Sequence, residues 1–211
     1  LNGDSSRGGY QSYGNGSAMR VAPVAYRFDS MVTMLNVAKA SAMCTHDHLK
    51  GVEGAQMVAL ATWAARQGLK ADEIRLLVEQ NSSYNLSFDQ NDLIKHYFFQ
   101  PTCEGSVPHA IWAALEGPDF ESVMRRCLLI GGDTDTIAAI AGGLAELLYG
   151  IPEDMQRKAL DILRRDGPFL YDEYSRAIKH CKSYPDYITL NENQAGSQNK
   201  KGSIRSLLRS L

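Results

Sequence analysis

The stretch Gly131-Gly132-Asp133-Thr134-Asp135-Thr136-Ile137-Ala138-Ala139-Ile140-Ala141-Gly142-Gly143-Leu144-Ala145 decides the fold class of this sequence. Two glycines allow a tight turn, and two aspartates then precede an almost uncharged run of small apolar residues. We predict a helix from Thr134 to Tyr149, because the run lacks the period of a strand and is too long for one. A helix of such small residues suits the centre of a bundle, where its neighbours can approach closely.

Apolar residues on both sides of this stretch recur at helical spacing, and no convincing alternating pattern indicates a strand. Helices are expected from Asp29 to about Ala42, Gly51 to Gln67, Ala71 to Gln80, Ser106 to Gly117, Asp119 to Ile130, Pro152 to about Arg164 and Tyr171 to Lys179, with a short helical stretch between Ser17 and Pro23. Residues 81–105 are expected to be irregular. The sequence therefore predicts an all-α domain with six to eight helices.

The bulk composition is that of one globular domain. The chain has 211 residues, of which 44% are hydrophobic, and its formal net charge is −2, which does not favour a nucleic-acid partner. No apolar run approaches the ~20 residues that span a bilayer. The four cysteines are far apart, so we expect free thiols and a cytoplasmic location, not a disulfide framework or a zinc cluster. They are Cys44, Cys103, Cys127 and Cys181.

The acidic helix start, Asp133 to Thr136, is a candidate metal site. Hard cations such as Mg²⁺ take carboxylate and hydroxyl oxygens, and Asp133, Asp135 and Thr136 offer these within four residues. The alternative is plain N-capping, for which Asp and Thr are favoured residues. An EF-hand fits poorly, because the loop lacks the twelve-residue rhythm of ligands and its terminal Glu.

Two other segments are candidate binding elements. The glycine loop, defined here as Gly14-Asn15-Gly16-Ser17, can bring backbone N–H groups close to a phosphate, although Asn-Gly also marks ordinary turns. The segment Thr45-His46-Asp47-His48 breaks a helical pattern. It can simply end the helix around a satisfied histidine, or it can place a hydrogen-bonding group at a pocket rim; zinc would need further ligands.

Taken in order, these blocks resemble the ADP-ribosylglycohydrolase family, which includes the dinitrogenase-reductase-activating glycohydrolases, over roughly residues 10–165. The blocks are Gly14-Asn15-Gly16-Ser17-Ala18-Met19-Arg20-Val21, Thr45-His46, Glu104-Gly105-Ser106-Val107-Pro108-His109-Ala110 and Gly131-Gly132-Asp133-Thr134-Asp135-Thr136-Ile137-Ala138. The resemblance implies a compact orthogonal bundle of helices around two Mg²⁺ ions.

In site residues, the resemblance implies that Asp133, Asp135 and Thr136 bind metal. It also implies that the glycine loop Gly14-Asn15-Gly16-Ser17 holds the diphosphate and nearby ribose, and that His46 touches the ADP-ribose. The implied reaction is hydrolysis at the ribose C1″, which releases ADP-ribose from a modified protein or from another ADP-ribosyl acceptor. In the family, metal ions clamp the ribose hydroxyls during this reaction.

The sequence departs from the family in one respect. Family members carry an early acidic residue and a Thr-Asp-Asp-type cluster, which supply the other metal ligands and the general acid or base. Neither is found here, so we expect residues 1–180 to form the domain without its N-terminal segment and the general acid or base to lie upstream of Leu1. Two carboxylates alone bind Mg²⁺ weakly, so the chain by itself should be poorly active.

Three functional hypotheses therefore stand beside one another. The first is a Mg²⁺-dependent ADP-ribosyl hydrolase, the second is a non-catalytic ADP-ribose-binding relative, and the third is a structural helical domain in which the aspartates only cap a helix. Residues 181–211 are rich in Asn, Gln, Gly, Ser and Lys, and are expected to form a flexible basic tail.

Overall fold

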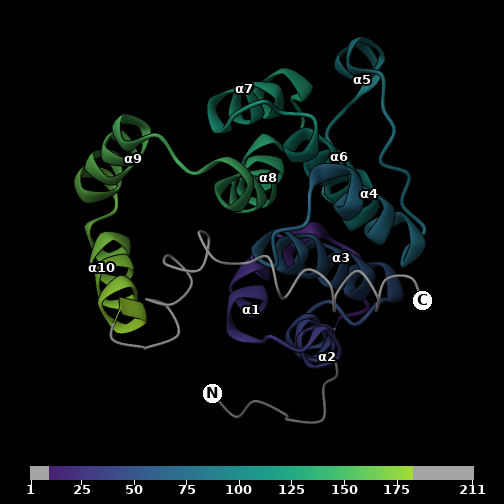
Figure 1. The fold of residues 1–211 in the computed structure, drawn as a ribbon, viewed down its shortest axis with the longest axis horizontal. Coiled ribbons are helices and arrows are strands. Elements are labelled where there is room, and N and C mark those ends of the chain that lie inside the picture. The colour runs from purple at the N-terminus through teal and green to yellow at the C-terminus, as the bar shows by residue number, and fades with distance from the viewer. Residues whose placement is uncertain (1–9, 183–211) are drawn as a thin grey trace. The chain divides into compact units, whose positions relative to one another are not determined.

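The computed structural model describes residues 10–182, and this part of the chain contains ten α-helices, one short 3-10 helix and no β-strand (Figure 1). The elements are η1 (Asn15–Ser17), α1 (Ala22–Arg27), α2 (Met31–Met43), α3 (Leu49–Arg66), α4 (Ala71–Gln80), α5 (Gln90–His96), α6 (Cys103–Leu115), α7 (Phe120–Ile130), α8 (Thr134–Tyr149), α9 (Glu153–Asp166) and α10 (Pro168–Lys182). The prediction of an all-α fold is confirmed. The tail expected over residues 181–211 lies outside the described residues, apart from Cys181 and Lys182, which end α10.

Helix packing divides the chain into two units, and one domain over residues 1–180 stays a prediction. The first unit ends at Gly150 and the second begins at Ile151. In the first unit, α3 packs against η1, α1, α2, α4, α6 and α8, so it is the centre of that unit (Figure 1). The second unit pairs α9 with α10, and the guanidinium of Arg164 lies 4.7 Å from the centre of the Tyr171 ring.

The central position of α3 follows from its small residues. Most of its length is buried, and alanines and glycines make up much of the buried surface. At Gly54 the neighbouring helix comes very close: a Cβ built there would lie 2.4 Å from the Sγ of Cys103, the first residue of α6. Gly54 therefore allows the start of α6 to lie directly on α3, which fixes the place of the glycine loop between them.

Helix α8 occupies the position that its composition predicted. It packs against α3, α6 and α7, and one of its faces lines the core with Ile137, Ile140, Ala141, Leu144 and Ala145. A Cβ on Gly142 would lie 3.3 Å from the Cε of Met124, which is tighter than an ordinary contact. The small residues of α8 are thus explained by close helix packing.

The helix starts predicted near Asp29 and at Asp119 agree with the structure. Ser30 accepts a hydrogen bond from the N–H of Thr33 at the start of α2, and Asp119 accepts one from Ser122 at the start of α7. Gly68 follows α3 with φ of 81°, the left-handed conformation that commonly ends a helix. Caps are local in sequence, which is why they could be predicted.

Three predictions about the elements were wrong. The helix count of six to eight is too low, mainly because α5 falls in the region predicted to be irregular, where two turns are too few for a periodic pattern. Helix α6 begins at Cys103 and not at Ser106, since the Thr102 hydroxyl accepts a hydrogen bond from the N–H of Gly105. Pro108 then lies inside α6, where it removes one backbone hydrogen bond. Helix α1 begins beside Pro23 instead of ending there, because proline suits a first turn.

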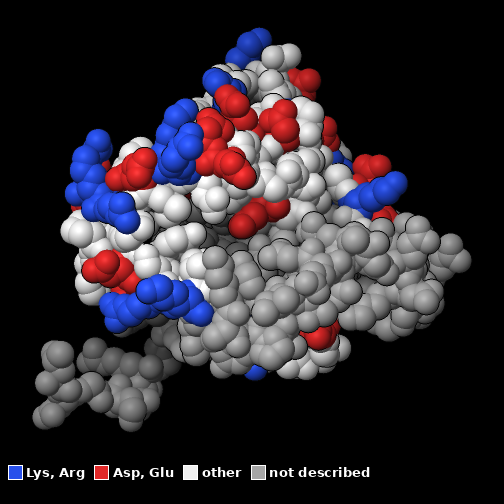
Figure 2. Space-filling view, turned by 60° about the vertical axis from the view of Figure 1, so that its left-hand side comes forward, with Lys and Arg blue, Asp and Glu red and all other residues white. Residues whose placement is uncertain are grey.

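The surface of the described residues carries charges of both signs. Acidic and basic side chains are interspersed over the face shown in Figure 2. Among the described helices, none is both long enough and apolar enough to cross a lipid bilayer.

Candidate functional site

The glycine loop lies between the first turns of α3 and α6, and hydrogen bonds hold it to both sides. The backbone N–H of Asn15 donates to the carbonyl of Pro101, just before α6, at 3.0 Å. The hydroxyl of Ser17 is buried and donates to the carbonyl of Gly51 on α3 at 2.7 Å. The side chain of Ser17 therefore anchors the loop.

Asn15 joins the glycine loop to the acidic helix start, although the two segments are 118 positions apart. Its side-chain amide donates to Oδ2 of Asp133 at 2.5 Å and to the hydroxyl of Ser106 at 2.8 Å. Ser106 in turn donates to the carbonyl of Gln100 at 2.9 Å. Asn15 is 7% exposed and Asp133 is 8% exposed, so this network is a buried link between the two predicted motifs.

The turn before α8 depends on two glycines in the left-handed region. Gly131 has φ of 74° and Gly132 has φ of 65°, a conformation that side chains with a Cβ rarely adopt. A Cβ on Gly132 would also lie 2.4 Å from Cε1 of Tyr97, whose hydroxyl donates to the carbonyl of Gly105 at 2.7 Å. Tyr97 thus packs directly on the turn that presents the aspartates.

The two aspartates do not behave as a simple N-cap. Asp133 occupies the cap position of α8, yet its side chain makes no capping hydrogen bond. Instead, its carboxylate receives the Asn15 amide, while Oδ1 of Asp135 accepts the N–H of Thr136 at 2.9 Å. A hydrogen bond with Asp133 and then that N–H lower the pKa of Asp135. Two carboxylates so close together repel each other unless a proton or a cation lies between them.

The donor set at this helix start fits a hard divalent cation in kind, because carboxylate and hydroxyl oxygens are its preferred ligands. Thr136 is buried beside the aspartates, and its hydroxyl lies 3.7 Å from the Sδ of Met19, in the segment that follows the glycine loop. Within residues 10–182, no group of three or more His, Cys, Asp or Glu side chains could hold a metal ion. This helix start therefore offers two carboxylates and one hydroxyl as candidate ligands.

His46 packs against the glycine loop. A Cβ on Gly16 would lie 3.0 Å from Nε2 of His46, and one on Gly14 would lie 3.5 Å from it. Burial, followed by the nearby Arg20 guanidinium, lowers the pKa of His46, so its ring is neutral near pH 7. His48, in the same segment, caps α3 instead. Its Nδ1 accepts a hydrogen bond from the N–H of Lys50 at 3.2 Å.

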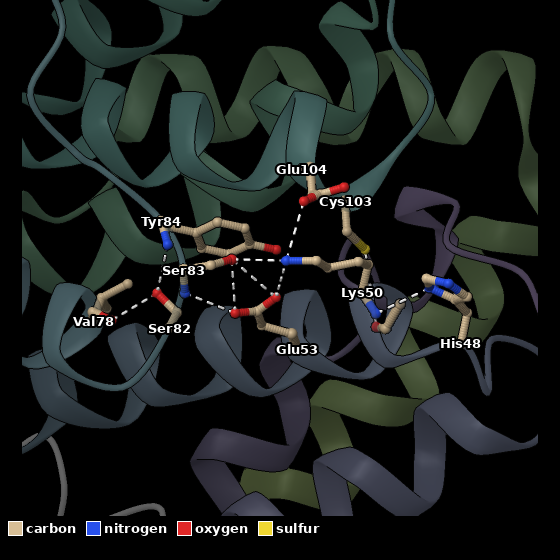
Figure 3. Close-up of polar contacts among 10 residues, drawn as sticks. His48, Lys50, Glu53, Val78, Ser82, Ser83, Tyr84, Cys103 and Glu104 are labelled. Carbon is tan, nitrogen blue, oxygen red and sulfur yellow. Dashed lines mark hydrogen bonds and ion pairs between the residues drawn. The ribbon is translucent and has the colours of Figure 1, made fainter.

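A charged cluster behind the loop holds α3 and α6 together (Figure 3). The ammonium of Lys50 lies 3.2 Å from Glu53 on α3 and 3.1 Å from Glu104 on α6, and donates to the hydroxyl of Ser83 at 2.9 Å. Hydrogen bonds with Glu104 and then Glu53 raise the pKa of Lys50. The buried ring of Tyr84 covers the cluster, and burial raises the pKa of its hydroxyl. This cluster steadies the helix starts on either side of the loop.

The structure brings the predicted residues of the glycine loop, His46 and the acidic helix start into one region. Sequence reasoning did not select Ser106 or Tyr97 as part of that region. Ser106 lies in a segment that was noted for its resemblance to the family, which was the available signal. Tyr97 stood in a stretch predicted to be irregular, and nothing in its local sequence pointed to Gly132.

Fold and geometry together define a class: an all-α protein in which a glycine loop and a histidine lie beside a pair of carboxylates at a helix start. The chain belongs to the ADP-ribosylglycohydrolase family, whose model matches residues 2–180.

Individual relatives agree with this assignment. The chain is 30% identical over 197 residues to ADP-ribosylhydrolase ARH3 of Mus musculus, a match that covers 71% of this chain and 53% of the mouse protein. The human ARH3 protein is 31% identical over 197 residues, with 71% and 54% covered. An uncharacterized protein of Archaeoglobus fulgidus is 28% identical over 193 residues, with 82% and 63% covered.

A solved structure, described as an ADP-ribosylglycohydrolase-related protein complex, has a similar fold. It superposes with a TM-score of 0.56 at 28% identity, and the match covers 69% of this chain and 54% of the solved one. The chain therefore spans about half the length of the mammalian relatives and of the solved structure that it matches.

Proposed function

We propose that this chain carries the ADP-ribose-binding part and half of the metal site of a Mg²⁺-dependent hydrolase. The enzyme would remove ADP-ribose from modified proteins, or from related ADP-ribosyl acceptors, by cleavage at the ribose C1″. The observation that carries this proposal is the buried hydrogen bond from the Asn15 amide to the Asp133 carboxylate, at 2.5 Å. It holds the glycine loop beside an oxygen-rich helix start, and family membership supports the same assignment.

Within the glycine loop, we assign the contact with the diphosphate to the backbone N–H of Gly16. The N–H groups of Gly14 and Asn15 already donate to the Ser12 hydroxyl at 3.2 Å and to the Pro101 carbonyl at 3.0 Å. Gly14 supports the loop by leaving room for His46, Asn15 by holding Asp133 and Ser17 by its anchor on α3. An anion in front of Gly16 would lie next to the His46 ring.

We assign the binding of Mg²⁺ to Asp133, Asp135 and Thr136, with further ligands from water or from residues beyond those described. Bound there, Mg²⁺ would hold the ribose hydroxyls and orient the anomeric carbon for attack by water. The residues of this chain contribute binding and orientation: the Asn15 amide fixes one carboxylate, and the first turn of α8 presents the other. The helix N-terminus favours both negative charges.

Calorimetric titration of the purified chain with ADP-ribose, in Mg²⁺ and in EDTA, tests this proposal. We expect binding that is at least about tenfold tighter with Mg²⁺, because even one polar contact with a charged group contributes roughly 1.5–3 kcal/mol. Asp135→Ala should remove the difference, whereas Asp161→Ala, an exposed substitution on α9, should preserve it. Binding that is indifferent to Mg²⁺ and unchanged by Asp135→Ala would contradict the metal assignment.

A second candidate function is a non-catalytic ADP-ribose-binding protein. It is favoured by one observation: residues 10–182 hold no group of three or more candidate metal-binding side chains. Release of ADP-ribose from an ADP-ribosylated protein distinguishes the two functions. We expect weak turnover by the 211-residue chain, which spans about half of its relatives. Robust turnover would show that two carboxylates suffice, and binding without any turnover would favour the second function.

A further inference from the structure

Three side chains form a relay of hydrogen bonds that ends at the glycine loop. The guanidinium of Arg20, from the segment after η1, donates through Nη2 to the hydroxyl oxygen of Thr45. The same oxygen lies 2.7 Å from Nδ1 of the neighbouring His46 ring. Thr45 and His46 follow the end of α2, where the His46 N–H bonds to the carbonyl of Ala42 at 2.7 Å. The relay thus connects two segments that flank the candidate site.

The chemistry of these groups favours one position for the ring proton. A guanidinium only donates hydrogen bonds, so the Thr45 oxygen must be the acceptor from Arg20. The Thr45 oxygen could accept a second hydrogen bond, but its own proton also needs an acceptor, and His46 Nδ1 lies 2.7 Å away. If the hydroxyl donates there, Nδ1 is unprotonated and the neutral ring carries its proton on Nε2.

Charge and burial favour the same state of the ring. Burial is the larger cause and the Arg20 guanidinium the second cause of the lowered pKa of His46. A protonated ring would take a positive charge into a partly buried site and place it near the guanidinium of Arg20. Both effects work against that form, so the relay acts on a neutral imidazole near pH 7.

The other end of the ring faces the glycine loop. A Cβ on Gly16 would come within 3.0 Å of Nε2, and on the opposite side a Cβ on Gly51 would come within 3.0 Å of the His46 Cβ. The ring is therefore confined between α3 and the loop, with Nε2 at the loop. Glycine at position 16 leaves the space that Nε2 faces.

We propose that Arg20 and Thr45 are positioning residues that hold His46 as the Nε2–H tautomer, a neutral hydrogen-bond donor aimed at a ligand oxygen in front of the glycine loop. The proposal rests on the proposed function for the identity of that ligand, a phosphate or ribose oxygen of ADP-ribose. The tautomer itself is a property of the free protein and can be measured without any ligand.

Long-range proton–nitrogen NMR of the ring nitrogens in ¹⁵N-labelled protein, at a pH above the His46 pKa, tests the proposal directly. His46→Gln identifies the His46 signals. We expect the wild type to show a protonated Nε2 and an unprotonated Nδ1. Thr45→Val should give a mixture of tautomers, and Thr45→Ser should restore the wild-type pattern. A protonated Nδ1 in the wild type, or an unchanged pattern in Thr45→Val, would overturn the proposal.

A second measurement links the tautomer to binding. ADP-ribose affinity should fall about fivefold to tenfold in Thr45→Val, the loss expected for one hydrogen bond, and recover in Thr45→Ser. Arg20→Met offers an independent break in the relay if Thr45→Val fails to fold. Wild-type protein that shows the Nε2–H tautomer and does not bind ADP-ribose would contradict the proposed function and leave the relay standing. Equal affinity in wild type and in a folded Thr45→Val variant would contradict the assignment of His46 as donor to this ligand.

Discussion

Asn15 links the glycine loop to the acidic helix start, two motifs that are far apart in the sequence. Its amide uses both of its hydrogens, one toward Asp133 and one toward Ser106, and all three side chains are buried. Because a buried carboxylate needs donors, this amide supports the acidic helix start even before a ligand binds. The Asn15 side chain therefore supports both the fold and the proposed metal-binding aspartate, while the proposed diphosphate contact belongs to the neighbouring N–H of Gly16.

Replacing Asn15 with Ala should lower the free energy of unfolding by about 1–3 kcal/mol, because Asp133 and Ser106 would lose a buried partner. Urea unfolding followed by circular dichroism measures this loss. Asn91→Ala, at an exposed position on α5, is the matched control and should change stability little. Equal stability of Asn15→Ala and the wild type would mean that the link to Asp133 contributes nothing measurable.

Gly16 is predicted to matter for binding more than for folding. A methyl group there would press on Nε2 of His46, at 3.0 Å, and would occupy the space in front of the loop. We expect Gly16→Ala to weaken ADP-ribose binding at least about tenfold with a small change in stability. Gly143→Ala is the control, since its Cβ would meet Ala22 at an ordinary 3.7 Å. Similar affinities in the two variants would speak against a ligand in front of Gly16.

At the scale of elements, the turn between α7 and α8 offers a comparison of two adjacent glycines. Both Gly131 and Gly132 have positive φ, but only a Cβ on Gly132 would clash, at 2.4 Å from Tyr97. Gly131→Ala should cost about 1–2 kcal/mol from backbone strain alone, and Gly132→Ala should cost clearly more. Urea unfolding of both variants decides the order. The reverse order would mean that Tyr97 does not pack on this turn.

Helix α6 contains a histidine that makes stability depend on pH. His109 stacks on Phe88, with ring centres 4.6 Å apart, and meets the edge of Tyr97 at 4.8 Å. Burial lowers the pKa of His109 below its ordinary 6.5, while its bond with the Gly105 carbonyl opposes part of that shift. The unfolded chain therefore binds a proton that the folded chain does not, in the interval between the two pKa values.

The sign of the effect follows from that difference in bound protons. Stability contributed by neutral His109 is fully present above pH 6.5 and decreases as the pH falls from 6.5 toward the folded-state pKa. Unfolding free energies measured in urea from pH 7.5 to pH 5 should fall less steeply in His109→Gln than in the wild type. Identical slopes in the two proteins would show that folding does not change the pKa of His109.

Sequence alone predicted most of the helices because capping and apolar spacing are local. It missed α5, whose two turns bury little besides Leu93. It also misplaced the start of α6, which is capped by Thr102 and begins at Cys103, three residues before the expected Ser106. Local signals also located Asp133 and the glycine loop. They could not show that Asn15 bonds to Asp133, because no local rule relates side chains 118 positions apart.

At the scale of the whole molecule, the proposed metal site needs more ligands than the described residues provide. The chain spans about half the length of its mammalian relatives, and the described residues give two carboxylates and one hydroxyl. Mg²⁺ prefers six ligands in near-ideal octahedral geometry, and water can supply some of them. Weak binding of Mg²⁺ alone and tighter binding together with ADP-ribose is the behaviour expected of such a partial site.

Thermal unfolding tests this coupling. A ligand present at about 100 times its Kd stabilises the folded state by about 2.7 kcal/mol, which corresponds to roughly 5–10 °C for a chain of this size. We expect a rise of that order with ADP-ribose and Mg²⁺ together, and much smaller rises with either alone. Asp135→Ala should remove the joint effect. Independent, additive shifts from the two ligands would contradict a shared site.

The most direct measurement of the central claim uses Mn²⁺, which can replace Mg²⁺ at oxygen ligands and broadens the NMR signals of nearby nuclei. With ADP-ribose present, a small fraction of one equivalent of Mn²⁺ should broaden the Asn15 side-chain amide and the Gly16 N–H signals. Asp135→Ala should abolish that broadening. Unaffected Asn15 and Gly16 signals, or broadening that persists in Asp135→Ala, would contradict a metal site shared by the glycine loop and the acidic helix start.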